Sequence, residues 1–139
     1  MDLSTALEYA AKGRTATLIT IRSDGRPQSS DIAYTVDGDV LHISVTDGRA
    51  KTRNMQRDPR VVVHLSNPAG WTYLSFDGTV ELSPVTTSPD DDTAEALVAY
   101  YRAVSGEHPD WDEYRQAMID EGRLIVTFTP TKVVGQING

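Results

Sequence analysis

The chain has 139 residues, no cysteine and a formal net charge of -7, which predicts one domain with one core and excludes disulfides, thiolate metal sites and a cysteine nucleophile. The acidic balance argues against broad binding to nucleic acid or to anionic membranes. No apolar run approaches the ~20 residues that cross a bilayer and the N-terminus shows no secretory signal pattern, so a cytoplasmic protein is expected.

The first third of the chain predicts a helix followed by antiparallel strands. Residues Leu3–Lys12 have the apolar spacing of a short amphipathic helix. The β-branched stretch Thr15–Arg22 predicts a strand buried on both faces, and an Asp-Gly turn leads from it to a second strand, Gln28–Val36. Another Asp-Gly turn leads to Val40–Val45, so these strands are expected to form a three-stranded meander.

A basic segment, Asp47–Arg60, follows the third strand. It carries five of the 13 Lys+Arg residues of the chain: Arg49, Lys51, Arg53, Arg57 and Arg60. A helix is expected within it up to Asp58, because the residue before a proline disfavours helical geometry. Free backbone N–H groups at the start of such a helix favour phosphate. The segment therefore predicts a site for a phosphate-bearing ligand, and the alternative is a solvated helix face that pairs with acids elsewhere.

The next part of the chain predicts a return to the sheet. Val61–Ser66 has the composition of a strand. Trp71–Phe76 and Thr79–Leu82 flank a third Asp-Gly pair, so we expect them to form a hairpin.

Beyond Ser83 the sequence predicts two helices and a last strand. Ser88 as the cap and Pro89 at the first helical position indicate a helix that ends at Gly106. A second helix is expected to run from a cap at Asp110 to Gly122. The last predicted strand is Leu124–Thr129, which Val133–Ile137 extends beyond Pro130.

Together these elements predict a mainly β protein in which residues 1–139 form a single domain. Six or seven short antiparallel strands with inserted short helices favour closure into a barrel, because closure removes exposed strand edges. Strands that are apolar on both faces also need a covered outer wall. In so small a chain we expect that cover to be a second copy of the chain.

Four segments resemble one known family: Gly25–Gln28, Arg49–Asn54, Arg57–Arg60 and Gly70-Trp71. They are similar to the pyridoxamine 5'-phosphate oxidase-like split β-barrel proteins, which have an FMN-binding-like fold. The similarity is greatest to the actinobacterial branch that binds the deazaflavin coenzyme F420, and it covers nearly the whole chain. The resemblance implies a homodimer with two cofactor sites in grooves at the subunit interface.

The resemblance also implies which residues hold the cofactor. Its phosphate would lie against Arg49, Lys51 and Thr52, because arginine offers a planar fork and lysine a movable charge. Arg53 would reach the same phosphate or the acidic tail of F420, and the remaining arginines of the segment are expected to form structural pairs. The ring system would lie along the second and third strands, against Gln28, Ser30, Asp31, Ser44 and Val45. Trp71 would pack on the cofactor bound by the partner subunit, with a core aromatic residue as the equal alternative.

The sequence differs from true pyridoxamine phosphate oxidases in two places. Those enzymes carry an R-x-x-x-x-K pair on the second strand that contacts the flavin phosphate, whereas Ser29–Thr35 has no basic residue. They also end in a basic substrate-binding tail, whereas this chain ends in Gly135–Gly139 without a charge. These differences favour F420 over FMN.

The resulting functional prediction is an F420-dependent oxidoreductase that transfers a hydride from the reduced deazaflavin to an unsaturated organic acceptor. Two alternatives stay open: an FMN-binding oxidoreductase of the same fold, and a non-catalytic F420 carrier. The three histidines show no metal-ligand spacing, and His42 and His64 are interpreted as sheet residues. Proton delivery is left to water or to a tyrosine such as Tyr34 or Tyr73.

Overall fold

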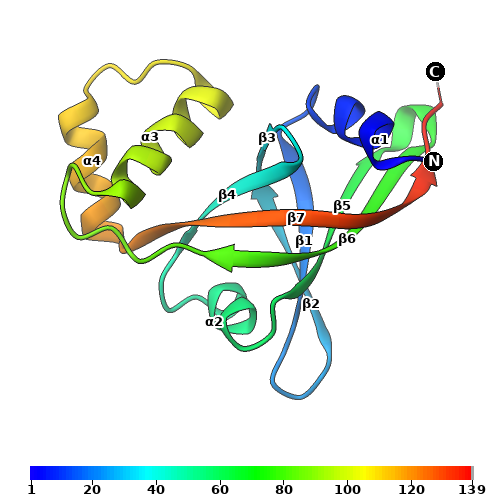
Figure 1. Cartoon of the computed structure of the whole chain (residues 1–139), viewed down its shortest axis with the longest axis horizontal. Helices are drawn as coiled ribbons and strands as arrows, with labels where there is room; N and C mark the ends of the chain where they lie inside the picture. Colours follow the sequence, from blue (N-terminus) through cyan, green and yellow to red (C-terminus); the bar gives the residue numbers. More distant parts are fainter. Residues whose placement is uncertain (139) are drawn as a thin grey trace.

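The computed structural model describes residues 1–138, which form one curled antiparallel sheet with helices around it (Figure 1). The seven strands lie in the order β2-β1-β5-β6-β7-β4-β3. Their bounds are β1 Thr15–Ile21, β2 Pro27–Ala33, β3 Thr35–Asp37, β4 Val40–Thr46, β5 Arg60–Asn67, β6 Thr72–Leu82 and β7 Arg123–Gln136. The helices within residues 1–138 are α1 Leu3–Ala10, α2 Ala50–Arg57, α3 Asp92–Ser105 and α4 Trp111–Glu121, with a 3-10 turn at Pro68–Gly70. The predicted six- to seven-stranded antiparallel split β-barrel is confirmed.

The chain leaves one edge of the sheet and enters the opposite edge at Tyr34. Before this residue β2 pairs with β1, and after it β3 pairs with β4 through the Asp37-Gly38 turn. Tyr34 is buried, and its hydroxyl donates to the backbone carbonyl of Ala10 at 2.6 Å. The predicted strand Gln28–Val36 is therefore two strands. The predicted three-stranded meander is wrong, because the two halves pair with different neighbours.

Strand β6 runs without interruption through Asp77 and Gly78, where the sequence predicts a hairpin turn. Gly78 faces β7 across a register irregularity, and an added Cβ there would lie 2.3 Å from the carbonyl oxygen of Thr129 and 2.7 Å from the ring of Phe128. Glycine therefore permits the close approach of the two strands. The predicted hairpin is wrong, whereas the predicted extension of the last strand beyond Pro130 is confirmed, because β7 spans 14 residues.

Two hydrophobic clusters hold the elements together. The larger joins the strands of the half-barrel to α1 and includes the fully buried rings of Phe76 and Phe128. The smaller joins α3 to α4 around Leu97 and Tyr114, and burying each such side chain contributes roughly 1.5–3 kcal/mol.

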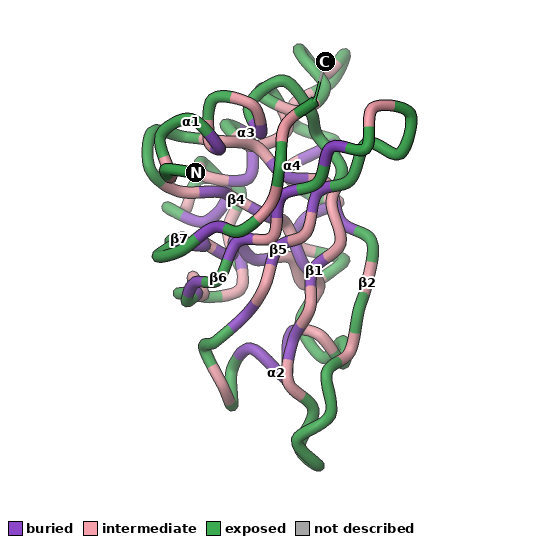
Figure 2. Tube along the Cα trace, turned by 90° about the vertical axis from the view of Figure 1, so that its right-hand side faces the viewer, coloured by how far each residue is buried: buried purple, intermediate pink, exposed green. Residues whose placement is uncertain are grey.

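Figure 1 shows α3 and α4 at the opposite end of the molecule from α1 and the two termini. In Figure 2 the buried residues follow the strands, while the tip of the β1–β2 hairpin is exposed. Within residues 1–138 no helix is both long and apolar enough to cross a membrane.

Asp91, and not the predicted Ser88, caps helix α3. Its carboxylate accepts hydrogen bonds from the backbone N–H groups of Thr87 at 2.9 Å and Ala94 at 2.7 Å, and from the hydroxyl of Thr86 at 2.8 Å. The backbone bond from Thr87, with help from the other donors, lowers the pKa of Asp91 from 3.8 to about 2. One carboxylate therefore joins the segment before α3 to the first turn of the helix.

We expect Asp91→Ala to lower the free energy of unfolding by about 1–2 kcal/mol, the usual effect of losing an N-cap. Because the folded pKa lies below the unfolded one, this stabilisation is complete above the unfolded pKa of 3.8 and is lost as the pH falls toward 2. Urea unfolding at pH 7 and pH 3 should show a larger difference from wild type at pH 7. Asp39→Ala, which removes an exposed carboxylate in a turn, is the control. Equal differences at both pH values would contradict the assignment.

Candidate functional site

The basic segment forms helix α2 and the turn before it, directly after β4 (Figure 1). Arg49 occupies the N-cap position with an extended backbone, and no side chain caps the first turn. The helix ends before Asp58, as predicted. Because the first N–H groups of a helix have no intrahelical partner, this end of α2 can bind an anion.

Buried polar contacts fix α2 to the sheet. The hydroxyl of Thr52 is fully buried and donates to the carbonyl of Thr46 at 2.7 Å. The amide nitrogen of Asn54 lies 3.1 Å from both the hydroxyl of Thr20 and the side-chain oxygen of Gln28. Two residues predicted to contact the cofactor, Thr52 and Gln28, thus position the helix. The role of Asn54 was not predicted, because one amide in a polar helix gives no signal until its burial is known.

The five cations of the basic segment fall into two groups. Arg60 pairs with Asp58 at 2.8 Å, so its predicted structural pairing is confirmed. Arg57 forms no ion pair within residues 1–138, but it donates to the carbonyl of Ile21 at 3.2 Å. The side chains of Arg49, Lys51 and Arg53 form neither an ion pair nor a hydrogen bond of this kind within residues 1–138.

Lys51 lies among other positive charges. Burial and the nearby charges of Arg123 and Arg49 lower its pKa. Arg123 begins β7 opposite Thr46, the last residue of β4, so the sheet register brings it close to α2. Its guanidinium also pairs with Glu121 at 3.0 Å, on a partly exposed surface. Arg123 was not predicted, since a single arginine after a helix has no distinguishing pattern. A bound anion would offset the repulsion in this cluster.

A groove of about 550 Å³ opens beside Lys51, within the size range of cofactor sites. Its lining comes from β2 and β4, from α2 and the start of β7, and from α3, α4 and their connection. Three residues predicted to contact the cofactor line it: Asp31, Ser44 and Lys51. Of the other lining residues, Tyr100 and Arg123 matter below.

Tyr100 lines the groove and connects β2 with β4. Its hydroxyl donates to the carbonyl of Ala33 on β2 at 2.9 Å. Burial raises the pKa of Tyr100, opposed in part by a backbone hydrogen bond from Ser44 on β4 and by the charge of Arg123. One side chain of α3 therefore joins both strands over which the cofactor ring was predicted to lie.

The remaining predicted residues lie apart from the lining of the groove. The hydroxyl of Ser30 is buried and has no hydrogen-bond partner among the described residues. The side chain of Val45 is in the barrel core at 1% exposure, so only its backbone can meet a ligand. Arg53 is exposed on α2. Trp71 is 80% exposed with a φ of 55°, next to the C-terminal strand. Tyr34 is buried in the core, where burial raises its pKa to about 12.

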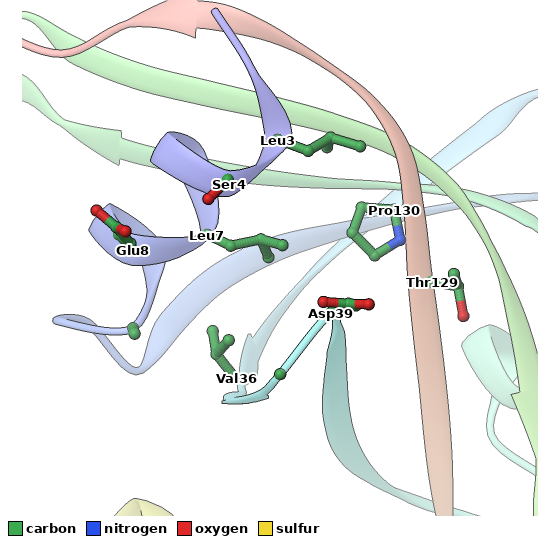
Figure 3. A pocket seen from close by; sticks show the side chains of 10 residues that line it. Leu3, Ser4, Leu7, Glu8, Val36, Asp39, Thr129 and Pro130 are labelled. Carbon is green, nitrogen blue, oxygen red and sulfur yellow. The ribbon is translucent and has the colours of Figure 1, made fainter.

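A second hollow, of about 520 Å³, lies between α1 and the β3–β4 turn (Figure 3). Its apolar lining includes Leu7, Val36 and Pro130, while Glu8 and Asp39 supply carboxylates. No lysine or arginine lines this hollow, so a phosphate would meet only negative charge there. This hollow is therefore less suited to a phosphate than the groove beside Lys51, which is the candidate site because it also contains three of the predicted residues.

Comparison with known proteins identifies the family of this chain. The family model for pyridoxamine 5'-phosphate oxidase matches residues 5–136. An F420 reductase shares 25% identity with a TM-score of 0.70, over 93% of this chain and 96% of that one. A conserved hypothetical protein from Mycobacterium tuberculosis shares 22% identity with a TM-score of 0.75, over 97% and 84%. A heme storage protein from Vibrio cholerae shares 15% identity with a TM-score of 0.71, over 100% and 98%. With its curled sheet and the family match over nearly its whole length, the chain belongs to the pyridoxamine 5'-phosphate oxidase family.

Proposed function

We propose that this protein is an F420-dependent oxidoreductase that reduces an unsaturated organic acceptor. The observation that carries the proposal is the cluster of Lys51 with Arg49 and Arg123. Burial and these two charges lower the pKa of Lys51, which has no carboxylate partner within residues 1–138. Such a cluster at the end of a groove fits a phosphate attached to a larger molecule.

The groove offers a separate place for each part of such a cofactor. Lys51, Arg49 and Arg123 would hold the phosphate, and the exposed Arg53 would reach the acidic tail of F420. The strands β2 and β4 would support the ring, with Asp31 and Ser44 on the groove side. When bound, the reduced cofactor supplies a hydride, and the acceptor takes one further proton from solvent. The protein's part is to orient the two molecules and to exclude water between them.

Two observations favour F420 over FMN. The segment Ser29–Thr35 on and after β2 has no basic residue, so the cations available to a phosphate come from α2 and the start of β7. Among the similar structures, the F420 reductase shares 25% identity over nearly the full length of both chains. FMN remains the second candidate, because a phosphate on a flavin would meet the same cluster.

We also propose that the protein acts as a homodimer. The outer face of the sheet carries exposed large hydrophobic side chains, with Tyr73 at 42% and Val134 at 51% exposure, and Trp71 stands beside them at 80%. The ring of His64 stacks on Tyr73 at 6.1 Å, which extends this face across β5. A second copy would cover it, and Trp71 would then reach the cofactor of the partner subunit.

A titration of the apoprotein with F420, FMN and hemin tests the cofactor assignment. We expect micromolar or tighter binding of F420, weaker binding of FMN, and no stoichiometric binding of hemin. Tighter binding of FMN than of F420 would make FMN the first candidate. Tighter binding of hemin than of either would show that the site does not hold a flavin or deazaflavin. Binding of F420 without turnover of any acceptor, when a cofactor-reducing system is present, would instead favour a carrier. Sedimentation of the same samples tests the dimer.

A further inference from the structure

The hollow between α1 and the β3–β4 turn, called the α1 hollow below, combines apolar and acidic side chains. Leu3 and Leu7 of α1, Val36 of β3 and Pro130 of β7 supply apolar surface. In Figure 3 the two leucines extend from α1 toward β7. The volume of about 520 Å³ is within the range of small-molecule sites. The α1 hollow shares no lining residue with the groove beside Lys51, so it is a separate cavity.

The leucines face the hollow because α1 packs on the barrel through smaller residues. Ala6 and Ala10, one turn apart on α1, are fully buried in the larger hydrophobic cluster. Leu3 and Leu7, also one turn apart, lie on the neighbouring face of the helix and are only partly buried against the same cluster. Their exposed surface would be covered by an apolar group in the hollow, which is favourable because it removes that surface from water.

The charged side chains of the α1 hollow are all negative. They are Glu8 on α1 and Asp39 in the β3–β4 turn, and neither forms an ion pair within residues 1–138. The C-terminal end of α1 also reaches the hollow through Ala11, and the last turn of this helix carries no basic residue. Lys12, the next residue, lines a different hollow. Because the C-terminal end of a helix dipole is negative, all three features favour a positively charged group.

We infer that the α1 hollow binds a small organic cation in which an ammonium group is attached to an apolar body. The ammonium group lies near Glu8 and Asp39, whose carboxylates accept hydrogen bonds from it. The apolar body lies on Leu3, Leu7 and Val36. The inference does not depend on the proposed function, because α1 lies at the opposite end of the molecule from α3 and α4, which line the groove beside Lys51 (Figure 1).

Calorimetric titration with 4-phenylbutylamine and 4-phenylbutyrate tests the charge selection, because the two compounds have the same apolar body and opposite charges at neutral pH. We expect the amine to bind about tenfold more tightly than the carboxylate, since the two lining carboxylates attract one and repel the other. Glu8→Gln and Asp39→Asn should each narrow this difference. Glu81→Gln, which removes an exposed carboxylate outside the hollow, should leave it unchanged. Equal affinity for the two compounds, or no detectable binding of the amine, would overturn the inference.

Two phenylalanine substitutions at adjacent positions of α1 test the location. Ser4 and Thr5 are both exposed, but only Ser4 lines the α1 hollow. Ser4→Phe should weaken the binding of 4-phenylbutylamine about tenfold or more, because the added ring takes the space of the ligand. Thr5→Phe should bind the amine as wild type does, and thermal unfolding without ligand checks that both variants fold. An unchanged affinity in Ser4→Phe, or an equal loss in both variants, would overturn the inference.

Discussion

Replacing Lys51 with alanine is expected to weaken cofactor binding by about 1–3 kcal/mol, or about 5- to 150-fold in Kd. The lysine supplies a charge-assisted contact to phosphate, and burial with the neighbouring charges of Arg123 and Arg49 lowers its pKa. In the absence of an anion these charges repel one another, so the substitution should not destabilise the apoprotein. A fluorescence titration with F420 measures the first effect, and thermal unfolding without ligand measures the second.

Lys132→Ala provides the matched control for Lys51→Ala. Lys132 is an exposed lysine on β7 opposite Asp77, far along the strand from Arg123. We expect its removal to leave the Kd for F420 unchanged, although it alters the net charge by the same amount. An equal loss of affinity in both variants would mean that overall charge, and not a contact at α2, attracts the cofactor. An unchanged Kd in Lys51→Ala would remove the phosphate assignment altogether.

Gly78→Ala should lower the free energy of unfolding by about 3 kcal/mol, at the upper end of the usual effect of overpacking. The added Cβ would overlap the carbonyl oxygen of Thr129 and the ring of Phe128, at 2.3 Å and 2.7 Å. The first of these is a backbone atom in the β6–β7 ladder, so relief requires the strands to separate. Urea unfolding with a common m-value is the measurement.

Gly38→Ala separates steric overlap from backbone strain. Gly38 has a φ of 61° in the β3–β4 turn, and an added Cβ would meet nothing within 4 Å. Its replacement by alanine should therefore lower the free energy of unfolding only by the strain of a left-handed residue, about 1–2 kcal/mol. If Gly78→Ala is no more destabilising than Gly38→Ala, then the close approach of β6 and β7 is not a constraint on the fold.

The sequence predicted most elements of the fold but not where the strands change partners. Local signals such as the Asp-Gly turn at Gly38 and the cap at Asp110 are complete within a few residues, and both predictions are confirmed. The Asp77-Gly78 pair carries the same local signal, yet there the glycine serves contact with a strand 50 positions later in the sequence. The break at Tyr34 likewise depends on distant neighbours, because a bulky aromatic residue in a strand pattern normally continues the strand.

The candidate site also combines residues that the sequence predicts with residues that only the folded structure brings together. The basic segment stands out in an acidic chain, and the structure brings three of the predicted residues, Lys51, Asp31 and Ser44, to one groove. Arg123 and Tyr100 were not predicted, because each is an ordinary residue in its own segment. Only the register of β4 with β7, and the packing of α3 over the gap between β2 and β4, brings them to the groove.

Tyr34 directly connects the two edge strands of the sheet, β2 and β3. Ala33 ends β2 and Thr35 begins β3, so the distance between these strands cannot exceed about 7 Å at this point, the span of two peptide units. Tyr100 bonds to Ala33 beside this connection, whereas toward the other end of β2 the side chain of Gln28 accepts a hydrogen bond from Asn54 of α2. The chain itself therefore fixes the separation of β2 and β3 at Tyr34, whereas side-chain hydrogen bonds fix β2 to α2 at the other end of the strand.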